Sequence, residues 1–353
     1  MASQSRVIVS ETSGRMAKTD LVNYTNIGLV LASFVIALYM PFELFLLSYA
    51  ILGPAHYLTE MSWLNKRQFF TKSSYDAWVL AAISLLLTSS AFLGPTSFYK
   101  IPAPTLVCLG FGWALVFYLT GNIVPRLIGL TLVAVVCFIS AHLSSLFNLF
   151  FGFVPSLIHV YVFTGIFILF GALKDKRRSG FLTLGTFLVC PLLYFVVQPN
   201  PVASSNYVLD SYWDLSVLNT LLLGIPTIKS RAEMDAAVVQ VFYSPKGLIV
   251  GRLIAFAYTY HYLNWFSKTS VIKWHQVSAR QLSVVTFLWI ASIGIYCYDF
   301  RLGIRVLSVL SMLHVFLEFP LNHMSVIGIY RELQGSVAKR LIFATRPAGS
   351  LAD

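Results

Sequence analysis

The sequence predicts an all-α protein, a polytopic membrane bundle of about ten transmembrane helices. Of its 353 residues, 57% are hydrophobic and only 11% are charged, and the mean hydropathy is +0.75. A soluble domain of this length needs a larger share of polar residues to cover its surface. The apolar runs are long enough to cross a bilayer core, which takes about 20 helical residues. We therefore expect an integral membrane protein.

Ten apolar stretches are the expected spans of a transmembrane domain over residues 22–332. Residues 1–21 precede it as a polar, mildly basic segment without the apolar core of a signal peptide, so we expect no cleaved signal. Residues 333–353 follow it as a tail. In chain order, the expected spans are 22–40, 42–63, 77–94, 103–120, 127–146, 148–173, 180–198, 249–266, 281–299 and 303–330.

The basic residues indicate how the chain is oriented. The formal charge is +11, but Lys and Arg lie in short clusters between apolar runs, which is typical of topology signals and not of a nucleic-acid surface. We expect no nucleic-acid partner and predict that both termini are cytoplasmic. The loops that would then be inner ones hold Lys66, Arg67, Lys72, Arg126, the cluster 174–178, Lys268, Lys273 and Arg280.

The segment 199–248 departs from this pattern. It opens with Pro199-Asn200-Pro201 and alternates polar and semi-apolar stretches. We interpret it as an outer loop with an interfacial or re-entrant helix. It could instead contain another span, which would invert the orientation of everything after it.

The four cysteines lie within apolar segments, and none belongs to a CxxC pair. This pattern indicates neither a disulfide framework nor a thiolate metal site. We expect all four to be small core residues: Cys108, Cys137, Cys190 and Cys297.

Six of the seven histidines also lie in apolar stretches, where ionisable side chains are costly and usually functional. Four of them fall at a similar distance from the start of spans that run in the same direction, so they share one depth near the midplane. These four are His56, His159, His261 and His314. His142 runs the opposite way and lies nearer the outer face. We expect a histidine cluster inside the bundle.

Two histidines have a glutamate one helical turn later, in the pairs His56/Glu60 and His314/Glu318. Residues four apart share a helix face, and such polar stripes should face the interior because lipid leaves them without partners. His323 is about 180° from His314 on an ideal helix. Pro320 should kink this helix and bring His323 within reach. Prolines just before His56 and His159 should loosen those helices in the same way.

Imidazole and carboxylate without thiolate form the ligand set of non-haem iron, and zinc or copper would also fit. Open positions on iron suit oxygen activation. Glu60 and Glu318 would either bind the metal, as in di-iron bundles, or orient the imidazoles. The pattern leaves open whether one metal or two are bound. The candidate metal ligands are the six histidines of the apolar stretches: His56, His142, His159, His261, His314 and His323.

An aromatic stretch surrounds His261, over residues 258–266. We expect Tyr260, Asn264 and Trp265 to line a pocket for an apolar substrate. The alternative interpretation is an interfacial aromatic belt.

Two short motifs resemble the Brp/Blh family of membrane β-carotene dioxygenases. Gly53-Pro54-Ala55-His56, with an acid at Glu60, is similar to the family's Gly-Leu-Pro-His segment, and Pro320-Leu321-Asn322-His323-Met324 is similar to its late Pro-His-Met. The resemblance covers these islands only. It implies that His56, His323 and His261 are iron ligands and that the reaction is oxidative carotenoid cleavage. Asn264 stands where the family has a second histidine.

We expect a membrane-embedded, histidine-ligated non-haem iron oxygenase acting on a carotenoid or another long lipid. Its partners would be dioxygen, membrane lipids and a lipid-soluble substrate, and the chemistry is compatible with a redox partner. Two alternatives use the same histidines: a proton-coupled transporter, which should have inverted repeats that are not visible here, and a bis-histidine haem protein. An acyltransferase using His261 and Asn264 is a further alternative.

Overall fold

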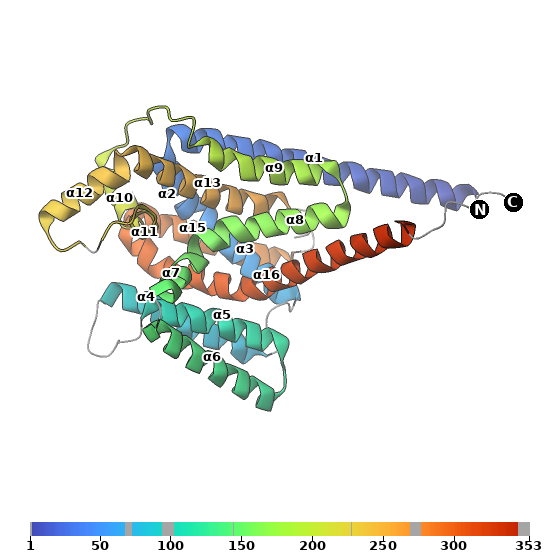
Figure 1. Ribbon diagram of the computed structural model, residues 1–353, viewed down its shortest axis with the longest axis horizontal. Coiled ribbons are helices and arrows are strands. Elements are labelled where there is room, and N and C mark those ends of the chain that lie inside the picture. Colours follow the sequence, from blue (N-terminus) through green and yellow to red (C-terminus); the bar gives the residue numbers. More distant parts are fainter. Residues whose placement is uncertain are drawn as a thin grey trace.

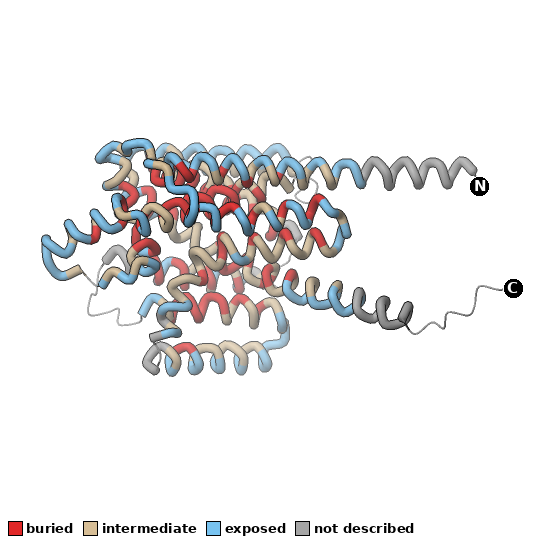
Figure 2. Tube along the Cα trace, turned by 45° about the horizontal axis from the view of Figure 1, so that its top comes forward, coloured by how far each residue is buried: buried red, intermediate tan, exposed pale blue. Residues whose placement is uncertain are grey.

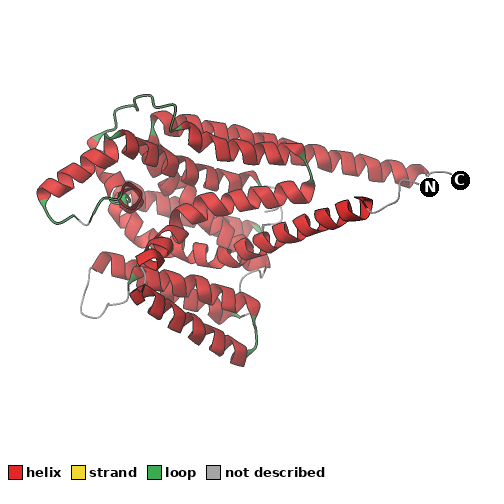
Figure 3. Cartoon of the chain, in the orientation of Figure 1, coloured by secondary structure: helices red, strands yellow, loops and turns green. Residues whose placement is uncertain are grey.

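A computed structural model describes residues 2–67, 73–93, 102–143, 145–226, 228–268 and 277–344. Within these ranges the chain forms helices and no strand (Figure 3). The predicted all-α class is confirmed. The helices of the first half are α1 (Ala2–Tyr39), α2 (Pro41–Leu47), η1 (Ser48–Leu52), α3 (Gly53–Arg67), α4 (Ser74–Leu93), α5 (Ala103–Leu119), α6 (Ile123–Leu143) and α7 (Ser145–Phe153). Those of the second half are η2 (Val154–Phe163), α8 (Thr164–Asp175), α9 (Arg178–Leu193), α10 (Asn206–Trp213), α11 (Val217–Leu223), α12 (Arg231–Phe242), α13 (Pro245–Ser267), α15 (Ala279–Tyr298) and α16 (Phe300–Ala344).

Five helical stretches are long and apolar enough to cross a membrane: Met16–Tyr39, Ile123–Ser140, Leu149–Asp175, Ala279–Tyr298 and Phe300–Gly335. A sixth results if α12 and α13, which are bent by 63° to each other, form one broken span. This is consistent with a membrane protein. The predicted number of about ten spans is not confirmed, because several apolar stretches form helices that are short or interrupted. Pro41, for example, begins α2 directly after α1 and divides the early apolar region.

The polar segment 199–248 folds into the short helices α10, α11 and α12, and it packs on α2 and α13. Arg252 of α13 holds the start of this polar segment in place. This side chain is fully buried, and it donates hydrogen bonds to the carbonyl oxygens of Leu38 at 3.0 Å and Pro199 at 2.5 Å. The end of α1 and the start of the polar segment are thereby fastened to the same helix.

The helices form a central bundle with an additional layer along one edge. α4, α5 and α6 lie together as that layer (Figure 1). On the opposite side, α1 packs against α9 and α13, while α16 runs through the middle and contacts α3, α4, α5, α8 and α15. Buried residues concentrate inside the bundle (Figure 2). The central helices are therefore the ones that can enclose a site.

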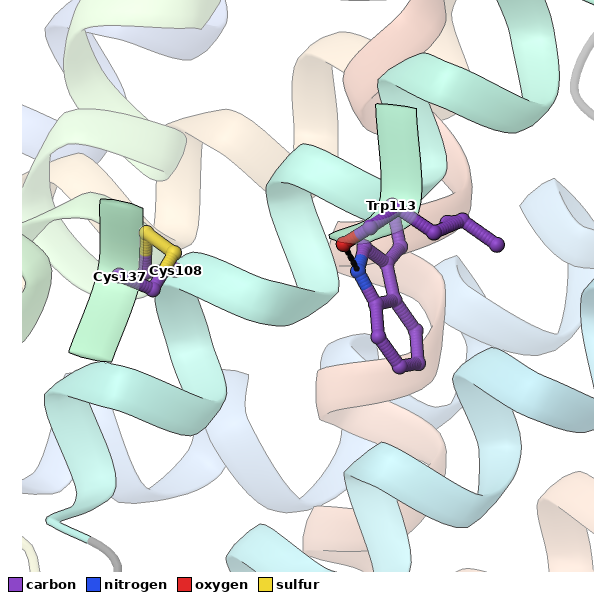
Figure 4. The surroundings of a disulfide bond; sticks show 4 residues. Cys108, Trp113 and Cys137 are labelled. Atoms are coloured by element: carbon purple, nitrogen blue, oxygen red, sulfur yellow. Dashed lines mark hydrogen bonds between the residues drawn. A yellow bond between two sulfur atoms is a disulfide. The ribbon is translucent and has the colours of Figure 1, made fainter. Parts of the chain in front are cut away.

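The edge layer contains a disulfide that corrects one prediction. Cys108 of α5 and Cys137 of α6 are bonded, with their Cα atoms 6.0 Å apart (Figure 4). Beside it, the indole Nε1 of Trp113 donates to the carbonyl oxygen of Leu130 at 3.1 Å. The expectation of no disulfide was wrong because the pairing depends on how two helices face each other. Of the two free cysteines, Cys190 is buried as predicted, whereas Cys297 is exposed and is no core residue.

Candidate metal centre

Four helices bring one imidazole each to a single point inside the bundle. His56 comes from α3, His159 from η2, His261 from α13 and His314 from α16, and each is at most 6% exposed. We call these four the histidine ring. Successive ring centroids are 4.7 Å apart for His56 and His261, 4.9 Å for His261 and His159, and 5.4 Å for each of the two contacts of His314. The predicted meeting of these four histidines is confirmed.

Two buried carboxylates complete the centre. Glu60 Oε2 lies 3.1 Å from His56 Nε2 on the same helix, as the spacing predicts. Glu318 Oε2 lies 3.4 Å from His159 Nε2, on a different helix. Glu318 therefore joins α16 to η2 in addition to sharing a helix face with His314.

The ligand atoms form two overlapping groups. The first group is His56, Glu60 and His314, and the second is His159, His314 and Glu318; within each, one ligand atom per residue lies within 4.8 Å of the others. Among the described residues, no other such group of His, Cys, Asp and Glu occurs. Each group contains two imidazoles and one carboxylate, and His314 belongs to both. His261 belongs to neither group, and its Nε2 lies 3.1 Å from Nε2 of His56.

Several of these atoms are buried without a hydrogen-bond partner. They include both ring nitrogens of His159 and of His314, as well as Glu60 Oε2 and Glu318 Oε2. Buried polar atoms in proteins are nearly always partnered, and each exception calls for an explanation. Two ligands of one cation, each about 2.0–2.1 Å from it, lie about 3.0–3.4 Å apart. The contacts of 3.1 Å and 3.4 Å between imidazole and carboxylate fit that spacing.

A comparison of the chain with models of known protein families, with curated proteins and with solved structures finds no match. The function must therefore be inferred from the centre itself.

Thr164 at the start of α8 sets the orientation of His261. Its hydroxyl Oγ1 donates to the carbonyl oxygen of Val160 at 2.9 Å and lies 2.8 Å from His261 Nδ1. A hydroxyl that has used its proton accepts from its second neighbour, so Nδ1 of His261 carries the hydrogen. The lone pair is then on Nε2, which lies 3.1 Å from His56 Nε2. This is how ligating histidines are typically oriented.

A π-helical segment lies at or directly before each proline that precedes a ring histidine. η1 is a π-helical segment that directly precedes α3, and η2 is a π-helical segment that contains His159. π-helical turns frequently occur at functional sites because they shift the register of side chains. The predicted loosening is found at Pro155, which lies in η2 with non-helical backbone angles at Ser156, whereas Pro54 and His56 lie in the α-helix α3, just after η1.

Aromatic side chains surround the first group. The indole of Trp265 lies edge-on to His56 with a centroid distance of 5.7 Å, and its Nε1 donates to Thr59 Oγ1 at 3.0 Å. Tyr262 lies 5.2 Å from His56, where its hydroxyl packs against Gly53. A Cβ at Gly53 would be 3.3 Å from that hydroxyl oxygen, so the absence of a side chain there permits the contact. These rings close the centre on this side.

The other predicted pocket residues differ in their placement. Asn264 is buried, and its Oδ1 has no hydrogen-bond partner. Tyr260 lies away from the histidine ring, because its hydroxyl donates to Asn26 Oδ1 of α1 at 3.2 Å. Tyr260 and His261 are adjacent in the helix and therefore face different directions. Tyr260 joins α13 to α1 and does not line the centre.

One predicted ligand, His323, is not brought into the histidine ring. α16 continues as one helix through Pro320, so His323 keeps its place on a different face from His314 and is only half-buried. It belongs to neither ligand group. The predicted ligand His142 lies in α6, and its side chain is outside the described part of the structure. Thr164 was not predicted as a site residue. Its place about one helical turn after His159 is the only signal for it in the sequence.

Proposed function

We propose that this protein is a membrane-embedded non-haem iron oxygenase that acts on a carotenoid or another long lipid. The observation that carries the proposal is the pair of His-His-Glu groups that share His314 and are buried with unpartnered ligand atoms. A ligand set of two histidines and one carboxylate is that of many non-haem iron oxygenases. Iron bound in this way supplies dioxygen activation at its open positions.

The residues of this chain would hold and shield such an ion. The carboxylates of Glu60 and Glu318 offset the charge of a cation, and burying them unpaired would be costly. Thr164 directs Nε2 of His261 toward Nε2 of His56, a ligand of the first group. Trp265 and Tyr262 exclude water from one side of the centre, which strengthens electrostatic interactions inside it.

Of the alternatives, the haem protein fits the geometry poorly. Two axial imidazoles must be separated by the macrocycle between them. Here the rings of His56 and His261 contact each other directly, with their Nε2 atoms 3.1 Å apart. This contact leaves no space for a porphyrin between the two rings.

A proton relay is the second candidate, and one observation favours it. Thr164, His261, His56 and Glu60 form a continuous series of polar contacts of 2.8–3.1 Å. Such a series could pass protons in a transporter. Metal content distinguishes the two candidates, because a relay needs no ion.

The experiment is metal analysis by mass spectrometry, together with an optical spectrum, on protein purified in detergent. We expect near-stoichiometric iron and no Soret band. His314→Ala should lose the metal, and the isosteric Glu318→Gln should lose part of it. His323→Ala is the matched control, since it removes a histidine of the same helix that lies outside both groups, and it should retain the metal.

Folded, metal-free wild-type protein would overturn the oxygenase proposal and favour the proton relay. Loss of iron in His323→Ala equal to that in His314→Ala would overturn the ligand assignment. It would instead favour His323 as a metal ligand, as the resemblance of residues 320–324 to the Brp/Blh family implies.

A further inference from the structure

An apolar cavity of about 500 Å³ lies between α5, α6, the α7–η2 region and α16. All of its lining residues are apolar or cysteine, and they include the disulfide between Cys108 and Cys137. Its volume is within the range of about 300–1,000 Å³ typical of small-molecule sites. A polar group placed in it would lose its hydrogen bonds to water without gaining others. The cavity suits a hydrocarbon and nothing more polar.

The cavity adjoins the second ligand group. Two lining residues, Ile158 and Phe319, are the immediate neighbours in sequence of His159 and Glu318. A third, Phe163, lies edge-on to His159 with a centroid distance of 6.4 Å, and its ring is 6.3 Å from that of Phe319. A molecule in the cavity would therefore be separated from the metal-ligating side chains by little more than these two rings.

The opposite side of the cavity reaches the surface of the protein. Leu132, Val136 and Phe150 line it and are 61%, 51% and 54% exposed. Leu132 and Val136 belong to the stretch Ile123–Ser140, which is long and apolar enough to cross a membrane and has only 6% of its residues buried. An apolar helix with so exposed a surface is suited to contact lipid tails. The mouth of the cavity then opens to the hydrocarbon region of the bilayer.

We propose that this cavity receives the hydrocarbon chain of the substrate, which enters sideways from the bilayer past α6 and reaches the His159–Glu318 side of the centre. This inference rests on the proposed function for the identity of the bound molecule as a substrate. Lipid tails are as apolar as the cavity wall, so transfer from the bilayer gains little hydrophobic free energy. The cavity therefore serves to orient the chain, and the disulfide between α5 and α6 keeps its wall in place.

The test is photo-crosslinking with a palmitic acid analogue that carries a diazirine near the end of its chain. The purified protein is irradiated with the probe in detergent, and labelled peptides are identified by mass spectrometry. We expect labels on peptides of α5, α6, η2 and α16 that line the cavity. Excess unlabelled palmitate should reduce them.

The deciding variant is Val136→Trp, which places a large ring at the mouth of the cavity. Its matched control is Val135→Trp, because Val135 is the adjacent residue of α6, is 49% exposed and does not line the cavity. Labelling should fall several-fold in Val136→Trp and stay unchanged in Val135→Trp. If Val136→Trp does not fold, Leu132→Trp replaces it, with Ile128→Trp, also exposed and outside the lining, as the control.

Iron content measured on the same samples separates this inference from the proposed function. Iron-loaded protein that is not labelled at these peptides, or is labelled equally in Val136→Trp, overturns the cavity inference alone. Metal-free protein that is labelled as expected supports the hydrocarbon site and overturns the oxygenase. Loss of labelling on dimerisation, detected by light scattering, would assign the exposed face of α6 to a second copy of the chain and overturn lateral entry.

Discussion

The hydroxyl Oγ1 of Thr164 lies 2.8 Å from Nδ1 of His261, and this contact determines which ring nitrogen of His261 faces the histidine ring. The hydroxyl already donates to the carbonyl oxygen of Val160, so it accepts the Nδ1 hydrogen and leaves Nε2 free. His261 belongs to neither ligand group, but its Nε2 lies 3.1 Å from Nε2 of His56, which belongs to the first, so Thr164 sets how His261 contacts that ligand.

Replacing Thr164 should weaken metal binding without removing a ligand. In Thr164→Val, the Nδ1 hydrogen of His261 has no acceptor, so the ring loses its fixed orientation beside His56 of the first ligand group. The loss of an outer contact that orients a metal site typically costs about 10- to 100-fold in metal affinity. Thr164→Ser keeps the hydroxyl and should bind nearly as the wild type does. Titration of metal-stripped protein with Fe(II) measures the metal affinity of both variants. Equal affinities for the valine variant and the wild type would contradict this role.

The shared residue His314 should affect metal content more than either carboxylate does. It belongs to both ligand groups, whereas Glu60 and Glu318 belong to one each. We expect His314→Ala to abolish iron binding, and Glu60→Gln and Glu318→Gln each to reduce it in part. Iron per protein chain, measured with circular dichroism as the folding control, tests this order. A His314→Ala variant that retains more iron than Glu318→Gln would refute it.

Gly110 of α5 should be intolerant of a side chain, because α16 packs directly on it. A Cβ there would lie 2.3 Å from the ring of Phe316. Phe316 is fully buried, and in the sequence it lies midway between the site residues His314 and Glu318. Gly110→Ala should destabilise the protein by about 1–3 kcal/mol through overpacking. Gly185→Ala of α9 is the control, since its Cβ would meet nothing within 4 Å. It should be neutral or stabilise by up to about 1 kcal/mol.

Thermal unfolding in detergent compares these two glycine variants with the wild type. A shift in melting temperature for Gly110→Ala no larger than that for Gly185→Ala would show that α16 does not pack on α5 in this way.

The cysteines should differ in their reactivity toward a thiol reagent. In native protein without reductant, N-ethylmaleimide should label Cys297, which is exposed, and should spare Cys190, which is buried. Cys108 and Cys137 should be labelled only after reduction, because they are bonded to each other. Peptide mass spectrometry reads all four positions in one sample. Labelling of Cys108 in unreduced protein would argue against the disulfide.

The sequence by itself determined the all-α class and much of the centre. Composition and the length of apolar runs identify membrane helices, and the rise per residue sets the depth of each side chain along its helix. Equal depth was enough to predict that His56, His159, His261 and His314 meet. The spacing of four residues was enough to pair His56 with Glu60.

The tertiary structure decided what depends on the rotation and bending of each helix, because those are set by packing between segments far apart in the chain. It joined Glu318 to His159, placed Thr164 behind His261 and turned Tyr260 toward α1. It also kept α16 helical through Pro320, which leaves His323 outside the ring, and it bonded Cys108 to Cys137. Spacing along one helix sets depth and relative angle on that helix, whereas the partner across a bundle is chosen only when whole helices pack together.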